Sequence, residues 1–402
     1  MAGLNDSVNV TDDLDVELFQ GYPPGLLEYA TASCIILMFI GIPGNLVTII
    51  ALANYRKVRN ATAIFIMNLS LSDLLFCCFI LPLSASTFSH RSWIHGSFLC
   101  HMFPFARYAL VAVSLLTICA ITINRYIMIA HPRLYPKLYT SRNIGIMIAI
   151  IWIFSFGMLA ATCVAKWGRF GLDTRIGSCS ILPDDKDRSP KKILFLTAFS
   201  ITCTAIVVCY TRIFFIVRKT TKNTMRTERK VPNDDTSTSS EISTSALVKL
   251  NIPEARTTVT EVASIRSSSS PGLQRTVTIK VERRDGKKVE SKSDPSELRR
   301  TALRRSMAML KMSLPTRKDR RLGTLILAIM ISFCVCHLPI TVTKLLREGK
   351  PSPGLNIASY ILIFLSSSIN PIIYVVMSNE YRKAYKHLLK LRRRKEKFSL
   401  NA

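Results

Sequence analysis

The stretch YATASCIILMFIGIPGNLVTIIALAN, residues 29–54, contains no Lys, Arg, Asp or Glu. A helix needs roughly 20 apolar residues to cross a ~30 Å hydrocarbon core, so this segment is long enough to span a membrane. Similar apolar runs follow along the chain, which predicts an all-α membrane protein built as a seven-transmembrane helix bundle. The seven expected spans are residues 29–54, 62–88, 98–129, 143–165, 191–217, 321–346 and 354–377.

Composition and charge support the same class and indicate an orientation. The chain has 402 residues, of which 49% are hydrophobic, yet its formal net charge is +28, so apolar and basic residues must be segregated. Residues 1–28 hold no Lys or Arg, whereas the first loop holds Arg56, Lys57 and Arg59. Since basic loops stay inside, we expect a multi-pass plasma-membrane protein with an extracellular N-terminus. No cleaved signal peptide is expected, and the first span would act as the anchor.

The chain is expected to divide into membrane and soluble parts. Residues 218–319 are rich in Ser, Thr, Lys and Arg and poor in aromatic residues, which predicts a disordered loop. Two interpretations remain open for this loop, kinase sites or a solvated tether that attracts anionic lipid. The expected parts are an acidic extracellular N-terminus (1–28), transmembrane helices 1 to 5 (29–217), a cytoplasmic third loop (218–319), transmembrane helices 6 and 7 (320–377), and an amphipathic helix with a basic cytoplasmic tail (378–402).

Two features belong to the secretory side of the membrane. Asn5 and Asn9 each begin an acceptor triplet in the outside segment, which predicts glycosylation. Most of the 11 cysteines lie within apolar spans and are read as small buried hydrophobes. Cys100 and Cys179 are the two that reach the oxidising face, and we expect them to form a structural disulfide.

The polar residues inside the spans need an explanation, because an ionisable group in hydrocarbon costs at least ~2.5 kcal/mol on insertion scales. Asp73 lies about 18 Å into the second span, near the midplane. Ser114 and Asn370 belong to the groups that could surround it. One interpretation is a hydrated Na⁺ bound by Asp73, Ser114 and Asn370, and an equally weighted one is a water network around a protonated acid. Apart from this candidate Na⁺, no cofactor is expected.

A set of motifs in a fixed order points to a family. The motifs are Gly44-Asn45, the run from Asn68 to Asp73, Trp93, Cys100, Asn124-Arg125-Tyr126, Trp152, Tyr210, Pro339 and Asn370-Pro371-Ile372-Ile373-Tyr374. In this order and spacing the chain resembles the rhodopsin-like (class A) G-protein-coupled receptors over all seven spans. The segments 124–126 and 130–135 resemble the insect trapped-in-endoderm and moody receptors, which implies a role in cell migration, polarity or barrier formation.

The resemblance implies a receptor that activates a heterotrimeric G protein and is not an enzyme. Arrestin, receptor kinases, membrane lipids and an unknown extracellular ligand are further expected partners, and nucleic acid is not. At rest Arg125 is expected to pair with Asp319, and Pro339 would provide the kink at which the sixth span swings outward. Asn124 replaces the usual acid beside this arginine. The expected coupling and activation residues are Asn124, Arg125, Tyr126, Leu134, Tyr210, Asp319, Pro339, Asn370, Pro371 and Tyr374.

The expected ligand site lies in the outer half of the third span. Arg107 is about 10 Å below the outer surface, and in this family amine receptors carry an aspartate at that point. An arginine favours an anionic or lipid-like ligand, held by charge-assisted hydrogen bonds. The alternative is that Arg107 reaches outward or pairs with Asp173 or Asp184. The expected ligand residues are Phe103, Arg107, Tyr108, Val111 and His337.

Overall fold

A computed structural model describes most of the chain and divides it into two compact units. One unit comprises residues 1–216 and 315–402, and the other comprises residues 217–314. The described residues are 17–55, 60–165, 167–183, 190–228, 279–281, 289–291, 317–346 and 352–388. Asn5 and Asn9 therefore lie outside the described residues, as does most of the predicted third loop.

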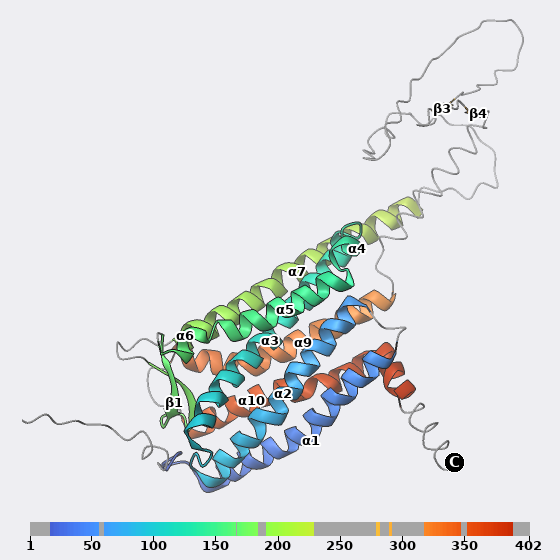
Figure 1. The fold of residues 1–402 in the computed structure, drawn as a ribbon. Helices are drawn as coiled ribbons and strands as arrows, with labels where there is room; N and C mark the ends of the chain where they lie inside the picture. Colours follow the sequence, from blue (N-terminus) through green and yellow to red (C-terminus); the bar gives the residue numbers. More distant parts are fainter. Residues whose placement is uncertain are drawn as a thin grey trace, which may run out of the picture. The chain divides into compact units, whose positions relative to one another are not determined.

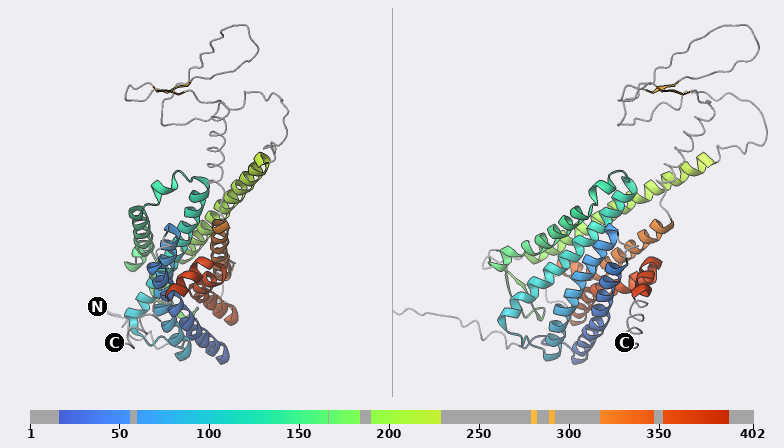
Figure 2. Two further views of the ribbon diagram at one scale, coloured as in Figure 1. Left: turned by 90° about the vertical axis from the view of Figure 1, so that its right-hand side faces the viewer. Right: turned by 45° about the vertical axis from the view of Figure 1, so that its right-hand side comes forward.

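Among the described residues, seven helices are long and apolar enough to cross a membrane, as expected from the hydropathy of the sequence. The helices are α1 (Pro24–Asn54), α2 (Ala61–His90), α3 (Gly96–Ala130), α4 (Tyr135–Leu138), α5 (Ser141–Gly157), α6 (Ala160–Cys163), α7 (Pro190–Glu228), α9 (Arg317–Leu346) and α10 (Pro353–Met377). The fourth span combines α5 with α6, over Ser141–Cys163. Figures 1 and 2 show α1, α2, α3 and α10 running side by side.

Helix boundaries differ from the sequence prediction where polar residues continue a helix. α7 extends to Glu228, so residues 218–228 are helical and do not belong to an irregular loop. α9 begins at Arg317, before the predicted start of the sixth span. Hydropathy marks only the part of a helix inside hydrocarbon, and polar helix-forming residues extend it into water. The second unit also contains a short antiparallel hairpin of β3 (Ile279–Val281) and β4 (Val289–Ser291).

Glycines allow α1 to approach α2 and α10 closely. A Cβ atom added at Gly41 would lie 2.6 Å from Cys77 Sγ and 2.7 Å from Ser368 Oγ. At Gly44 it would lie 3.0 Å from the ring of Pro371. Small residues at such crossings let helix backbones pack tightly in a membrane, where burial supplies little driving force between helices.

The β1–β2 hairpin lies at the end of the bundle where α1 begins (Figure 1). β1 (Arg169–Asp173) and β2 (Ser178–Leu182) pair in antiparallel fashion. The predicted disulfide between Cys100 and Cys179 is present and ties β2 to the start of α3, with Cα atoms 5.3 Å apart. The hairpin is therefore fixed covalently to the bundle.

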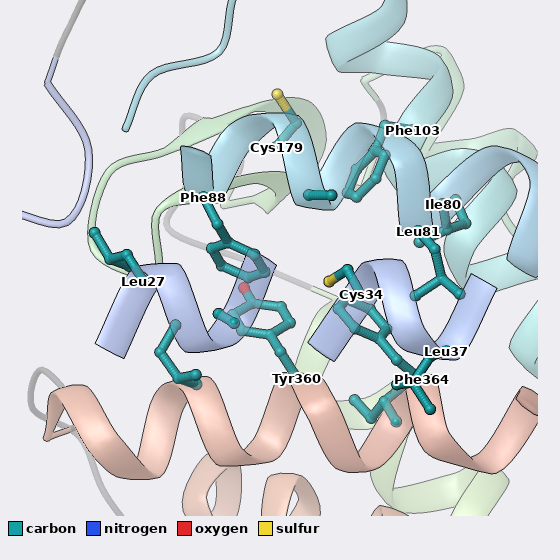
Figure 3. Close-up of a cluster of buried hydrophobic side chains, with 14 of the residues drawn as sticks. Leu27, Cys34, Leu37, Ile80, Leu81, Phe88, Phe103, Cys179, Tyr360 and Phe364 are labelled. Atoms are coloured by element: carbon teal, nitrogen blue, oxygen red, sulfur yellow. The ribbon is translucent and has the colours of Figure 1, made fainter. Parts of the chain in front are cut away.

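The segment before α1 packs into the same end of the bundle, which the sequence did not suggest. Leu18 and Phe19 are buried, and the ring of Phe19 lies 5.4 Å from that of Phe88 in α2. Phe88 in turn contacts Tyr360 of α10, with ring centroids 6.1 Å apart (Figure 3). Residues 18–22, which we call the N-terminal plug, thus pack between α2 and α10.

A short helix over residues 379–388 follows α10 at the opposite end, as predicted (Figure 1). Its apolar face is covered, because Tyr381 and Ala384 are buried and Tyr385 OH lies 2.8 Å from Thr48 Oγ1 of α1. Arg382 and Lys383 are exposed. The apolar face of this helix therefore packs at least in part against the bundle.

Candidate functional site

Asp73 is the centre of a buried polar cluster that joins three helices. Its Oδ2 accepts a hydrogen bond from Asn370 Nδ2 of α10 at 2.7 Å, and its Oδ1 accepts one from Ser114 Oγ of α3 at 3.2 Å. Ser114 also contacts Ser72 Oγ at 3.0 Å. The side chain of Asp73 is 2% exposed. The three residues proposed as Na⁺ ligands therefore lie together, and each carboxylate oxygen keeps capacity for another partner.

Unsatisfied polar atoms surround this cluster. Asn45 donates to the carbonyl of Ser367 at 2.9 Å, but its own Oδ1 has no hydrogen-bond partner among the described residues. The hydroxyls of Ser70 and Tyr374 are also buried without a partner there, each about one helix turn from the Asp73 level. Buried polar groups of this kind are usually satisfied by water. The oxygen atoms of Asp73 and Ser114, together with the free Oδ1 of Asn45, fit the coordination of a hydrated cation.

The Arg125 region lies at the opposite end of α3 from the disulfide. Arg125 is 3% exposed, and its Nη1 lies 3.6 Å from Met128 Sδ. Tyr210 OH donates to the carbonyl of Gly323 at 3.3 Å and so links α7 to α9. The side chain of Asp319 lies outside the described residues, so the expected Arg125–Asp319 pair stays a prediction.

Asn124, which precedes Arg125 in α3, is an uncharged residue that hydrogen-bonds to two neighbouring elements. Its Oδ1 accepts a hydrogen bond from Thr62 Oγ1 at 2.9 Å, and its Nδ2 donates to Tyr135 OH at 3.5 Å. Tyr126 packs edge-on against His131, with ring centroids 5.8 Å apart. Asn124 therefore connects α2 and α3 to α4 without adding a charge.

The remaining residues of the expected activation set are Leu134, Pro339 and Pro371. Leu134 precedes α4 and is exposed, as expected for a side chain available to a partner. Pro339 lies inside α9, and Pro371 lies inside α10.

An apolar pocket lies between four helices in the half of the bundle near β1–β2. Its empty volume is about 510 Å³, including space open to the surroundings. Its lining comprises Tyr108, Val111, Ala112 and Leu115 of α3, Met158 and Leu159 at the end of α5, Leu194, Ala198 and Phe199 of α7, and Phe333, His337 and Thr341 of α9. Sequence reasoning identified Tyr108, Val111 and His337, and it missed the α5 and α7 walls, which are ordinary apolar span residues in the sequence.

Arg107 and Phe103 do not line this pocket. The Arg107 guanidinium carbon lies 4.7 Å from the ring centroid of Tyr360 and 5.9 Å from that of Phe364, so it faces α10. Phe103 packs against Trp93, with ring centroids 5.4 Å apart. Of the five expected ligand residues, Tyr108, Val111 and His337 therefore line the pocket, and Phe103 and Arg107 do not.

The cation of Arg107 is buried without an acid beside it. Its side chain is 7% exposed, and no ion pair within the described part of the chain involves it. Asp173, one of the acids considered as its partner, instead binds Lys191 Nζ at 3.2 Å. Asp184, the other, lies outside the described residues. Contact with two aromatic rings stabilises the charge only in part, so an anion is a suitable partner for Arg107.

Comparisons with known proteins agree with this architecture. The family model described as 7 transmembrane receptor (rhodopsin family) matches residues 44–374. The receptor moody of Drosophila melanogaster is 38% identical, with 94% of this chain and 56% of that protein covered. Protein trapped in endoderm-1 of the same organism is 32% identical, with 90% of this chain and 78% of that protein covered.

A solved structure extends the comparison to the fold. Squid rhodopsin superposes with a TM-score of 0.66 at 19% identity, with 95% of this chain and 91% of that chain covered. The chain spans about half the length of the moody receptors that it matches. Helix order, motif positions and the family match together show that this multi-pass membrane protein belongs to the rhodopsin family of seven-transmembrane receptors.

Proposed function

We propose that the protein is a plasma-membrane receptor that senses an extracellular ligand and activates a heterotrimeric G protein. The observation that carries the proposal is Arg125, a buried cation at the end of α3 opposite the disulfide, next to the link between α7 and α9. Outward motion of α9 would expose this cation to a protein partner. The basic first loop supports an orientation with this end in the cytoplasm.

Nucleotide exchange tests this proposal directly. The receptor and a heterotrimeric G protein are reconstituted in vesicles, and GDP–GTP exchange is compared with vesicles that lack the receptor. Transport is the alternative activity for a protein with several spans and buried charges, and uptake of a panel of small solutes into the same vesicles tests it. Exchange above the control supports the receptor function, whereas uptake without exchange contradicts it. Arrestin, receptor kinases and anionic lipids are further proposed partners. The proposed process is cell migration, polarity or barrier formation.

The proposed ligand has an anionic group that meets Arg107. Replacing Arg107 with leucine removes the guanidinium and is expected to weaken an anionic agonist by at least ~1.5 kcal/mol, or more than about tenfold. Agonist dose-response curves on cells with equal surface expression measure this shift. Arg169→Leu, in the exposed part of β1, is the matched control. An unshifted curve for the Arg107 variant would show that this cation does not touch the ligand.

The proposed cation at Asp73 would stabilise the resting receptor. Asp73 and Ser114 would supply oxygen ligands. Asn370, expected as a third ligand, donates its Nδ2 hydrogen to the carboxylate and would orient it instead. At Na⁺ concentrations ten times the dissociation constant, binding adds about 1.4 kcal/mol of stability. We expect the melting temperature to be higher in sodium chloride than in choline chloride of equal ionic strength.

Asp73→Asn should remove this sodium effect, because an amide gives the cation no charge. Asp173→Asn, at the β1–β2 hairpin, is the control and should retain it. A melting temperature of the unmutated receptor that does not depend on sodium would support the alternative, a water network around a protonated carboxyl group.

A further inference from the structure

Two free cysteines meet where α7 passes α9 inside the membrane-spanning part of the bundle. Cys203 lies in the fifth span and Cys334 in the sixth, and their sulfur atoms are 3.8 Å apart. A disulfide bond holds two sulfurs at about 2.05 Å, so these two would have to approach each other by roughly 1.8 Å. The two residues are 131 positions apart in the sequence, so the fold alone brings them together.

Other free cysteines of the spans contact hydroxyl groups instead. Cys119 Sγ of α3 lies 3.6 Å from Thr202 Oγ1, and Cys77 Sγ of α2 lies 3.6 Å from Ser368 Oγ. Within the described part of the chain, Cys203 and Cys334 are the one pair of free cysteines whose sulfur atoms are in contact. This pair can therefore react internally, whereas the other free cysteines serve as small apolar side chains.

Cys334 lies on the part of α9 that would move during activation. Pro339 removes one helix hydrogen bond and would provide the kink at which the inner part of α9 swings outward. Cys334 precedes Pro339 by five residues, which places it roughly 7.5 Å along the helix toward its inner end. A bond from Cys334 to Cys203 would therefore hold the moving part of α9 against α7.

A second contact between the same two helices lies further toward the inner end. Tyr210 OH of α7 donates to the carbonyl oxygen of Gly323 of α9 at 3.3 Å. Gly323 precedes Cys334 by 11 residues, or roughly 16 Å of helix. The hydrogen bond can break and form again when α9 moves, whereas a disulfide bond nearer the kink cannot. The covalent bond would thus preserve the arrangement in which Tyr210 contacts Gly323.

The cysteine pair lies at the edge of the contact between the helices, beside surface that faces the bilayer. Both cysteines are partly exposed. Val207 follows Cys203 by four residues and is 63% exposed, and Ile331 precedes Cys334 by three residues and is 55% exposed. Residues three or four positions apart lie on the same face of a helix. A reagent dissolved in the hydrocarbon can therefore reach the two thiols.

We propose that Cys203 and Cys334 form a reversible disulfide bond when the membrane contains lipid hydroperoxides, and that this bond locks α9 against α7. The locking effect rests on the proposed function, because it requires that outward motion of α9 activates the G protein. The receptor would lose signalling while its membrane is oxidised and regain it after reduction. The bond itself is detectable without any G protein.

The reaction proceeds in two balanced steps. The sulfur of one thiol attacks the hydroperoxide, the O–O bond breaks, and the thiol proton passes to the departing oxygen, which leaves a sulfenic acid and an alcohol. The sulfur of the second thiol then attacks the sulfenic sulfur. The S–S bond forms, the S–O bond breaks, and water leaves with the second thiol proton. The two thiols are oxidised by two electrons, the hydroperoxide is reduced, and exchange with an added thiol reverses the bond.

Peptide mass spectrometry of the oxidised full-length receptor tests the bond. Receptor in phospholipid vesicles is treated with cumene hydroperoxide, its free thiols are alkylated, and it is digested without reductant. We expect a peptide of α7 linked to a peptide of α9, and a thiol reductant should remove this link. Cys203→Ser and Cys334→Ser should each abolish it. Cys209→Ser of α7 and Cys336→Ser of α9 remove neighbouring free cysteines and are matched controls that should retain it.

Melting temperatures establish that the serine variants are folded, and alanine replacements provide a second pair of variants if a serine variant is not. Absence of the linked peptide from the oxidised unmutated receptor would overturn the proposal. The same peptide in a folded variant that lacks Cys203 or Cys334 would also overturn it.

Nucleotide exchange tests whether the bond locks α9. The hydroperoxide is removed before the G protein is added. When about nine in ten receptors carry the bond, exchange should fall about tenfold, because only the others can move α9. A thiol reductant should restore it, and the Cys203→Ser and Cys334→Ser variants should keep their exchange after oxidation. Untreated receptor exposed to the same reductant is the control for the Cys100–Cys179 bridge.

The bond, the lock and the receptor function fail separately. Unchanged exchange by receptor that carries the linked peptide would overturn the lock. Equal loss of exchange in the two serine variants would assign the effect to another group and would overturn it as well. If untreated receptor promotes no exchange, the proposed receptor function fails and the lock with it, while the linked peptide still decides whether the two thiols react.

Discussion

Replacing Arg125 with alanine is expected to lower receptor-dependent nucleotide exchange about 10- to 100-fold. The estimate follows from losing one charged hydrogen-bonding group, worth ~1.5–3 kcal/mol, at the surface proposed to meet the G protein. Exchange on a co-reconstituted G protein measures the effect at equal receptor amounts. Arg125→Lys should recover only part of the activity, because an ammonium lacks the planar fork of a guanidinium.

Two further variants provide a control for Arg125→Ala and a test of the expected pair between Arg125 and Asp319. Arg133→Ala removes an exposed arginine from the turn after α3 and should change exchange little. Asp319→Ala should have the opposite effect and raise exchange without ligand, since it removes the expected resting partner. Undiminished exchange in Arg125→Ala would exclude this cation from coupling, and unchanged basal exchange in Asp319→Ala would contradict the resting pair.

Removing the Cys100–Cys179 disulfide is expected to cost about 4 kcal/mol of stability. The bridge closes a loop with a sequence separation of 79, and chain entropy gives roughly this value for such a loop. The Cys100→Ser, Cys179→Ser double variant should therefore melt at a clearly lower temperature and reach the cell surface in smaller amounts. Cys78→Ser, which removes an exposed free cysteine in α2, is the control.

Reduction of the unmutated protein provides a second test of the bridge. A reductant should lower its melting temperature and leave that of the double variant unchanged. Equal melting temperatures for the oxidised protein and the double variant would show that the bridge does not stabilise the fold.

The spans and the disulfide could be predicted because their causes are local in the sequence. An apolar run long enough to cross a membrane has few alternatives to a helix. Cys100 and Cys179 stood apart from the other cysteines because they lie outside hydrocarbon. Asp73 and Asn370 could be associated because their motifs occur in a known order. In these cases composition or motif was sufficient, and no packing detail was needed.

The two sides of α3 could not be predicted, because neighbouring residues on a helix face different directions. Arg107 and Tyr108 are adjacent, yet one contacts Tyr360 of α10 and the other Ser180 of β2. Helical periodicity gives the angle between them but not which element lies on each side. Burial of Phe19 depends in the same way on Phe88 and Gly177, which are distant in the sequence. The pair Leu18-Phe19 does not stand out from the other apolar residues of this acidic segment, so no clear signal of its burial is present in the sequence.

The amide of Asn124 leaves the position beside Arg125 without an ionisable group. An acid at this position would add a group that gains or loses charge, whereas an amide has no ionisable proton. Burial raises the pKa of Tyr381, the nearby phenol beyond the seventh span, further above its ordinary value of about 10. The hydrogen-bonded bridge from Thr62 through Asn124 to Tyr135 therefore joins α2, α3 and α4 without a carboxyl group.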